Sequence, residues 1–263
     1  MELTPLGDEE SIFSNENALD PDFLPPLMPF REGEMKEIAS ALEPLLNERN
    51  GRNLHVTGSA GIGKTHAVKK IIRDMKEEGV NAFYVNCWTN STGREVFQEI
   101  CSKLRIPFKA EESESVLLKK ILPRTENKAI VFCFDEIDRA EEHGFLYSVL
   151  EEFSVKSIVL ISNRKDFLAG LDDRIRSRLL PKEIVFREYS EQETASILKE
   201  RRKYAFFEET WARDAVQLLD EKTRSSDLRF AIKLMKLSGL KAEDDASRIV
   251  RAEHVEKAFS ELS

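Results

Sequence analysis

The sequence predicts a doubly wound α/β domain, a parallel five-stranded sheet with helices on both faces, followed by a small all-helical domain. Up to about residue 187, short apolar runs rich in Val, Ile and Phe alternate with segments of helical periodicity. This alternation is typical of buried parallel strands joined by crossover helices. From about residue 188 only helical patterns follow. A chain of 263 residues, 41% of them hydrophobic, is long enough for both parts.

The composition predicts that the chain has three regions. Residues 1–20 are acidic and poor in apolar anchors, so we expect an acidic flexible arm. The proline-rich segment 21–30 opens a domain expected over 21–187, and the helical domain is expected over 188–263. Residues 1–50 carry 12 acidic and 3 basic side chains, a net charge of −9, whereas the remaining 213 residues carry a net charge of +1. The sequence therefore has no bulk basic footprint for nucleic acid.

The elements are predicted in chain order. Five apolar runs predict strands at 54–57, 82–86, 129–134, 157–162 and 183–186, with helices at 31–47, 64–78, 92–104, 113–122 and 144–154. In the second domain, Ser190 and Glu193 form a capping box that opens a helix. Helices over 212–221, 227–238 and 252–262 follow, and Gly239 is expected to end the second of these.

Several classes of protein are excluded at this stage. No apolar run approaches the ~18 residues of a membrane helix, and the acidic N-terminus has no signal-peptide pattern. The three cysteines lack metal-site or disulfide spacing and are expected in the core, and the four histidines are scattered. We therefore expect a cytoplasmic protein that is associated with no membrane.

A phosphate-binding motif lies between the first predicted strand and the next helix. It matches G-x-x-x-x-G-K-[ST], whose glycines let backbone amides surround an anion. The lysine reaches the β- and γ-phosphates and the threonine binds Mg²⁺, so the sequence predicts a site for ATP or ADP with Mg²⁺. The predicted nucleotide-binding residues here are Gly58, Ser59, Ala60, Gly61, Ile62, Gly63, Lys64, Thr65 and His66.

Two further strands end in polar side chains. Asp135 follows an apolar strand and is predicted to join Thr65 as a Mg²⁺ ligand, and Glu136 is predicted to polarise the attacking water. Asp138 is interpreted as a helix cap. Asn163 follows the next strand and is predicted to contact the water and the γ-phosphate.

In this order, these pieces resemble the AAA+ ATPases. Asn163 stands where sensor 1 lies in that superfamily, and the segment Asp227 to Ala231 resembles sensor 2, with Arg229 directed at the γ-phosphate from a helical lid. The sheet and the helical domain fit the AAA+ base and lid.

Within AAA+, the chain is similar to the archaeal replication initiators of the origin-recognition and cell-division-control family. Four segments carry the resemblance: 24–34, 84–87, 171–179 and 184–193. It implies that the opening motif with Arg31 lines the adenine pocket, and it adds Tyr189, before the lid, to the cofactor-binding set. It also implies an arginine finger that completes a neighbour's site. Arg174 and Arg178 both remain candidates, whereas Arg176 is interpreted as surface charge.

The resemblance implies a slowly hydrolysing ATP-dependent switch in DNA replication initiation. Its partners would be DNA, other AAA+ subunits or further copies of itself, and a replicative helicase, in the cytoplasm at the nucleoid. Two alternatives stay open: an AAA+ adaptor in another DNA transaction, such as transposition or clamp loading, and a non-catalytic scaffold that holds ADP.

We expect this chain alone to bind DNA weakly. Only 34 residues follow Arg229, and they are predicted as lid helices rather than the family's winged helix. The family's DNA-contacting loop corresponds to 105–109 and runs into Glu111, Glu112 and Glu114, which repel phosphates. Any phosphate contact is expected at Lys109 and near Arg201, although the basic run 199–203 is interpreted mainly as a solvated face. Trp88 and Trp211 are expected to pack.

Overall fold

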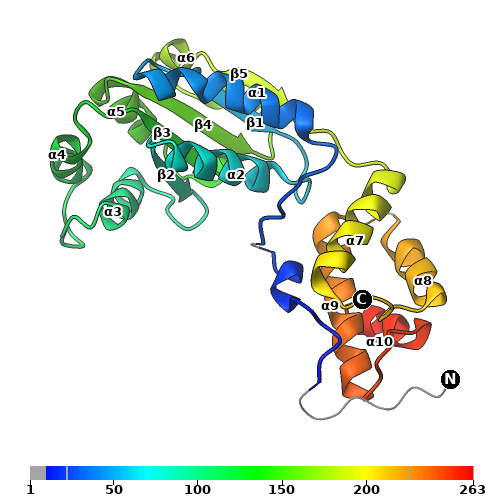
Figure 1. Ribbon diagram of the computed structural model, residues 1–263. Helices are drawn as coiled ribbons and strands as arrows, with labels where there is room; N and C mark the ends of the chain where they lie inside the picture. Colours follow the sequence, from blue (N-terminus) through cyan, green and yellow to red (C-terminus); the bar gives the residue numbers. More distant parts are fainter. Residues whose placement is uncertain (1–9, 22, 225, 263) are drawn as a thin grey trace. The chain divides into compact units, whose positions relative to one another are not determined.

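The computed structural model describes residues 10–21, 23–224 and 226–262. The chain divides into two compact units (Figure 1). The base unit is Arg31–Arg187, and the lid unit combines Glu188–Ser263 with Met1–Phe30, within the described residues. Each unit has its own hydrophobic core.

The base unit is built on a five-stranded parallel sheet with the order β2-β3-β4-β1-β5. The strands are β1 (Leu54–Thr57), β2 (Asn81–Asn86), β3 (Ile130–Asp135), β4 (Lys156–Ser162) and β5 (Lys182–Val185). β1 and β3 are buried along their whole length and β4 beyond its first residue, as their continuous apolar runs predict. The predicted α/β sheet is confirmed.

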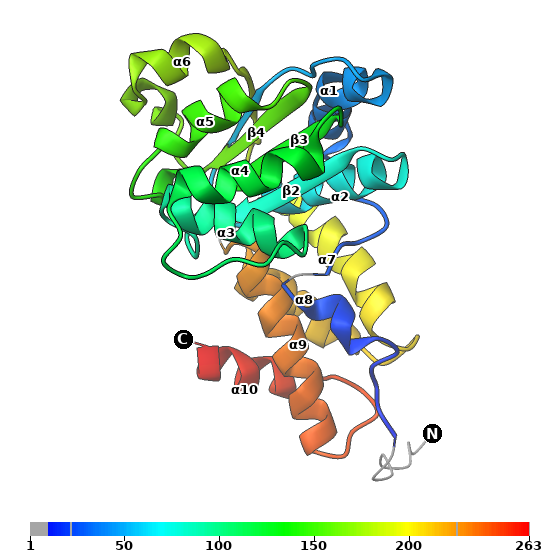
Figure 2. The ribbon, with the colours of Figure 1, turned by 90° about the vertical axis from the view of Figure 1, so that its left-hand side faces the viewer.

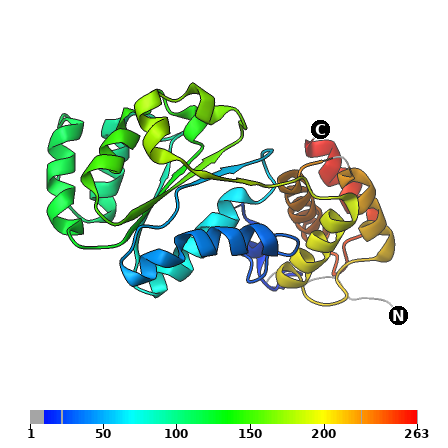
Figure 3. The same cartoon turned by 90° about the horizontal axis from the view of Figure 1, so that it is seen from above.

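Helices cover both faces of this sheet. They are α1 (Glu32–Leu42), α2 (Lys64–Glu77), α3 (Gly93–Lys103), α4 (Glu114–Thr125), α5 (Gly144–Glu152) and α6 (Asp173–Leu179). Figure 3 shows α1 and α2 on one face and the later helices on the other. The alternate strand residues Phe132, Phe134 and Leu160 join the core under α3–α6, so Cys133 and Asp135 point to the α2 face.

Register places the chemistry at one edge of the sheet. Thr57 lies opposite Ser162 on β1 and β4, and Asn86 lies opposite Asp135 on β2 and β3. Because all strands are parallel, the residues that follow β1, β3 and β4 meet at the same end. The phosphate-binding loop, Glu136 and Asn163 begin there.

The lid unit is helical, with α7 (Glu191–Ala205), α8 (Arg213–Thr223), α9 (Leu228–Asp244) and α10 (Ala252–Leu262) (Figure 2). The predicted capping box is present, because Ser190 accepts a bond from the Glu193 amide and Glu193 accepts one from Ser190. Gly239 does not end α9, so that expectation was wrong. A Cβ at Gly239 would lie 2.5 Å from Phe13 and 2.7 Å from Phe206, so this glycine permits close packing within the helix.

The predicted flexible arm is also corrected for residues 10–20. A 3-10 turn, η1 (Glu16–Leu19), packs against the lid, and Ile12, Phe13, Ala18 and Leu19 are buried in the lid core. Glu243 accepts bonds from Ser11 Oγ at 2.6 Å and the Ile12 amide at 2.9 Å. Although few, the apolar residues are spaced to enter that core. The remainder of the predicted arm, residues 1–9, lies outside the described residues.

Among the described residues, none of the helices has the length and apolar character needed to cross a membrane. The three cysteines are buried and unpaired, as expected for core residues.

Candidate functional site

The phosphate-binding loop connects β1 to α2 and has backbone angles that suit glycine. Gly58 has φ +142° and Gly63 φ +92°, in the region that favours residues without a Cβ. A Cβ at Gly58 would collide with the carbonyl oxygen of Phe186. Immediately after Gly63, α2 begins at Lys64, so the N-terminal end of this helix lies at the loop. A loop and helix of this geometry can surround a phosphate.

Lys64 is the central cation of the site, with a side chain that is 6% exposed. Its Nζ donates to the carbonyl oxygens of Gly58 at 2.8 Å and Ser59 at 2.7 Å. It also donates to Asn163 Oδ1 at 2.8 Å. The loop lysine and the polar residue after β4 therefore belong to one hydrogen-bonded group, as the topology predicts.

Asp135 accepts three hydrogen bonds at the end of β3. Its Oδ2 accepts from Thr65 Oγ1 at 2.8 Å and from Tyr84 Oη at 2.7 Å, and its Oδ1 accepts from the Glu136 amide at 2.9 Å. Burial, followed by the charge of Asp135, raises the pKa of Tyr84 well above its usual range, so Tyr84 stays a donor. A hydroxyl and a carboxylate are ligands that Mg²⁺ prefers, so Thr65 and Asp135 fit that ion.

Glu136 and Asn163 flank this centre. Glu136 has φ +53°, the left-handed region that non-glycine residues rarely adopt, and such strain concentrates at functional sites. Asn163 follows β4, and its amide donates to Asp138 Oδ1 at 3.3 Å. Asp138 was expected to cap a helix, and this expectation is wrong. It lies within the turn η3 (Ile137–Arg139) and accepts from the Asn163 backbone.

Arg31, which the resemblance assigns to the adenine pocket, is buried against the phosphate-binding loop. Its side chain is fully buried, and Nε and Nη2 donate to the Ile62 carbonyl at 3.3 and 3.2 Å. Nη2 also donates to Arg187 O at 2.6 Å, Nη1 pairs with Glu34 at 2.9 Å, and the guanidinium lies 5.1 Å from the Phe186 ring centroid. These contacts hold the backbone of the phosphate-binding loop. A contact between Arg31 and adenine stays a prediction.

Four further predicted site residues lie on three other segments. Tyr189 precedes α7, and Arg229 is exposed in the first turn of α9, where Asp227 accepts from the Phe230 amide at 2.8 Å. Both belong to the lid unit. Arg174 and Arg178 are exposed on α6 of the base unit.

The basic run 199–203 is not a solvated face throughout, and this corrects the expected phosphate contact near Arg201. Arg201 is 8% exposed, donates to Ala18 O at 3.0 Å, and lies 5.0 Å from the ring centroid of Phe23. Its charge binds the N-terminal segment to the lid.

The two tryptophans differ. Trp211 packs edge-on against Phe206, as expected. Trp88 is 59% exposed, with the Arg139 guanidinium 4.7 Å from its ring centroid, so the expected packing is wrong for this residue.

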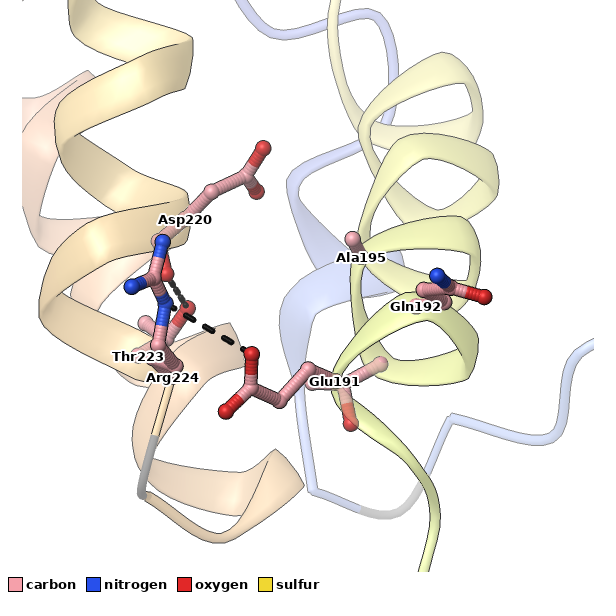
Figure 4. A pocket seen from close by; sticks show the side chains of 7 residues that line it. Glu191, Gln192, Ala195, Asp220, Thr223 and Arg224 are labelled. Carbon is pink, nitrogen blue, oxygen red and sulfur yellow. Dashed lines mark hydrogen bonds and ion pairs between the residues drawn. The ribbon is translucent and has the colours of Figure 1, made fainter.

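A hollow of about 190 Å³ lies between α7 and α8 of the lid (Figure 4). Glu191 and Arg224 form an ion pair across it at 3.6 Å, and burial raises the pKa of Asp220 on its wall. None of the predicted nucleotide-binding residues lines it; the lining residues are Glu191, Gln192, Thr194, Ala195, Asp220, Thr223 and Arg224.

Two contacts of the site were not predicted from the sequence: the bond from Tyr84 to Asp135, and the bond from the Asn163 backbone to Asp138. Tyr84 was noted only as part of a family-like segment. Its contact with Asp135 depends on the register of β2 against β3, in which Tyr84 lies opposite Cys133. A tyrosine two residues before the end of a neighbouring strand was the available signal.

Comparisons with known proteins agree with this geometry. Residues 47–169 match the AAA domain family, and residues 195–260 match the Cdc6 AAA+ ATPase-type lid domain. The chain is 31% identical to ORC1-type DNA replication protein 2 of Methanothermobacter thermautotrophicus, over 95% of this chain and 70% of the relative. It is 32% identical to the protein of the same name from Methanosarcina acetivorans, over 95% and 72%.

Solved structures show the same fold. The Aeropyrum pernix ORC1 protein in complex with DNA superimposes with a TM-score of 0.86 at 28% identity, covering 97% of this chain and 71% of that one. Base and lid are therefore shared along nearly the whole chain.

Proposed function

Because the chain belongs to the family of ORC1-type DNA replication proteins, within the AAA+ ATPases, we propose that it is an ATP-dependent switch in replication initiation. In this proposal it binds ATP with Mg²⁺ and hydrolyses it slowly, and the bound nucleotide controls assembly with other AAA+ subunits on DNA.

One observation carries the proposal: Lys64, Asn163, Thr65 and Asp135 form two hydrogen-bonded pairs at one end of the sheet. The lysine supplies positive charge for the β- and γ-phosphates. Thr65 and Asp135 would hold Mg²⁺, which supplies charge neutralisation at the phosphates. A non-catalytic scaffold that holds ADP would need the same residues, so a measurement of hydrolysis separates the two functions.

Hydrolysis requires a base and a further cation. Glu136 follows the Mg²⁺ ligand directly and is the proposed base for the attacking water. Asn163, which accepts from Lys64, is the proposed second contact to that water. The lid would contribute Arg229 as sensor 2, and Tyr189 and Arg31 are proposed at the adenine side.

The exposed arginines of α6 differ in their local contacts. Arg176 pairs with Asp173, and Arg178 pairs with Glu151 and lies 5.3 Å from the Tyr147 ring centroid. Within the described residues, the guanidinium of Arg174 has no such partner. A residue that acts on another subunit must reach outward, which favours Arg174 as the trans finger, with Arg178 as the alternative.

The relatives point to DNA and AAA+ subunits as partners. The Aeropyrum pernix ORC1 protein was solved with DNA, and we propose that this chain also binds DNA, weakly and through phosphates. Lys109 remains a proposed contact, whereas the buried Arg201 is not. A replicative helicase is a further proposed partner, and such work would place the protein in the cytoplasm at the nucleoid.

Calorimetry with ATP and Mg²⁺ tests the binding site. Lys64→Ala removes the cation that faces the phosphates, so nucleotide affinity should fall at least about tenfold, the effect of some 1.4 kcal/mol. Lys119→Ala, an exposed lysine on α4, is the matched control and should bind like the wild type. Equal affinities for all three proteins would refute the site.

Hydrolysis is tested separately by phosphate release. Glu136→Gln preserves shape and removes the base, so turnover should fall about 10²–10⁴-fold while ATP still binds. Glu126→Gln, exposed after α4, should keep wild-type turnover. If Glu136→Gln hydrolyses ATP at the wild-type rate, Glu136 is not the base.

A further inference from the structure

Tyr84 contacts the proposed metal ligand through its hydroxyl alone. Tyr84 lies on β2 opposite Cys133, and Asp135 is two residues further along β3, so both side chains point to the α2 face. Tyr84 Oη donates to Asp135 Oδ2 at 2.7 Å. The same oxygen accepts from Thr65 Oγ1 at 2.8 Å. One carboxylate oxygen thus receives two hydroxyl bonds from two different elements.

These bonds use most of the acceptor capacity of Asp135. A carboxylate offers about four lone-pair positions, and Thr65, Tyr84 and the Glu136 amide take three of them. The two hydroxyls occupy Oδ2, and the amide occupies one position on Oδ1. The orientation of the carboxylate is therefore determined from both sides, with one acceptor position left on Oδ1.

Tyr84 is itself held in place. Lys69, one turn along α2 from Thr65, places its Nζ 4.6 Å from the Tyr84 ring centroid. A cation over the ring face is attracted by the ring. The ring is also half-buried in the sheet. Tyr84 is thus fixed by its strand and by the helix that carries Thr65.

We propose that Tyr84 is a positioning residue of the magnesium site. Its hydrogen bond holds the Asp135 carboxylate in the orientation in which it also accepts from Thr65. This raises the affinity of the nucleotide-bound site for Mg²⁺. Outer-shell hydrogen bonds of this kind orient ligands, and their loss typically costs about 10–100-fold in metal affinity. This inference rests on the proposed function, because it concerns the metal that accompanies ATP.

The test is calorimetry of a non-hydrolysable ATP analogue, adenylyl imidodiphosphate, in EDTA and across a Mg²⁺ series. Tyr84→Phe keeps the ring and removes the hydroxyl. The affinity in EDTA should stay at the wild-type value, whereas the Mg²⁺ concentration for half-maximal enhancement should rise about tenfold. Tyr204→Phe, in the lid helix α7, is the control and should match the wild type.

A second readout separates positioning from mere stabilisation. Electron paramagnetic resonance of Mn²⁺ with each protein and the analogue measures bound metal directly, and thermal unfolding without ligand checks the fold. If Tyr84→Phe shows the wild-type Mg²⁺ and Mn²⁺ dependence, or weakens binding equally in EDTA, the inference is wrong. If the wild type binds the analogue without any response to Mg²⁺, or does not bind it, the proposed function fails as well.

Discussion

The Arg31 guanidinium donates two hydrogen bonds to the carbonyl oxygen of Ile62, at 3.3 and 3.2 Å. Ile62 belongs to the phosphate-binding loop, and the same guanidinium donates to the Arg187 carbonyl at 2.6 Å. One buried side chain therefore joins the start of α1, the loop and the end of the base unit. The geometry of the loop therefore depends on a residue that lies 31 positions before Ile62 in the sequence.

Arg31→Ala should destabilise the base unit by about 3–5 kcal/mol, the typical cost of breaking a buried ion pair from one side. The substitution removes the donor to the carbonyls of Ile62 and Arg187. It also removes the ion pair between Arg31 and Glu34. Arg31→Lys should recover little, because an ammonium cannot match the planar fork. Urea unfolding measures the effect, with the exposed Arg49→Ala as the control. An Arg31→Ala midpoint equal to that of Arg49→Ala would contradict this account.

Gly239 offers a prediction in the lid. Gly239→Ala places a methyl group against Phe13 and Phe206, at 2.5 and 2.7 Å before relaxation, so the lid should lose about 1–3 kcal/mol. Gly33→Ala is the matched control. Gly33 lies in α1 with no atom within 4 Å of an added Cβ, so alanine should stabilise its helix by about 0.5–1 kcal/mol.

Hydrogen exchange of lid amides, followed by mass spectrometry, reports the change in the correct unit. Protection should fall in α9 and in residues 10–20 for Gly239→Ala and stay unchanged there for Gly33→Ala. Equal lid protection in both variants would show that the Phe13 contact is not close-packed in solution.

The base sheet and its catalytic edge could be predicted from the sequence for a physical reason. Buried parallel strands are continuous apolar runs, and parallel strands present their carboxyl ends together. Thr65, Asp135 and Asn163 were therefore assigned to one place without any knowledge of side-chain contacts, and Lys64 contacts Asn163 as this topology requires.

What could not be predicted depends on tertiary neighbours. Gly239 has the local signature of a helix end, but Phe13, more than 200 residues away, requires a glycine within the helix. The sequence predicts Arg201 as surface charge, but in the structure it contacts Ala18 and Phe23. Tyr84 becomes part of the site only through the register of β2 and β3. None of these contacts has a periodicity to detect.

His55 predicts a pH dependence of stability. It is fully buried on β1, where its Nε2 lies 2.9 Å from Ser162 Oγ, and Ser162 in turn donates to Arg164 O. Nε2 is therefore the donor, and Nδ1 is buried with no hydrogen-bond partner among the residues that the structure describes. Burial lowers the pKa of His55 below its usual 6.5, although Glu183 and Asp138 raise it in part.

Because the folded pKa is depressed, the unfolded chain binds the proton first as the pH falls below about 6.5. Stability should be fully present above that pH and should decrease below it, by at most about 1.4 kcal/mol per pH unit for one proton. His55→Leu should flatten this slope between pH 6.5 and 5. Burial also lowers the pKa of His254 in the lid, so His254→Leu measures how much His254 contributes to the same slope of stability against pH. Unchanged slopes in urea unfolding of His55→Leu would show that His55 does not titrate this way.

The last prediction concerns the arginine that completes a neighbour's site. A trans arginine contributes about 10³–10⁵ in rate, so a dilute subunit should hydrolyse ATP poorly and its activity per subunit should rise with concentration. Arg174→Ala should abolish that rise and preserve ATP affinity. Arg178→Ala should retain it, because Arg178 is already paired with Glu151 and covers Tyr147. Arg176→Ala, on the same helix and paired with Asp173, is the control.

Mixing two inactive proteins makes the test direct. Glu136→Gln lacks the base but offers Arg174, whereas Arg174→Ala has the base but offers no finger. Combined, they should form some interfaces in which an intact base meets an intact arginine, so phosphate release should reappear. If instead Arg178→Ala loses the concentration dependence and regains turnover when mixed with Glu136→Gln, while Arg174→Ala alone behaves like the wild type, the two arginines have been assigned the wrong way round. If neither mixture releases phosphate and wild-type activity per subunit is the same at every concentration, hydrolysis is completed within one chain and α6 carries only surface charge.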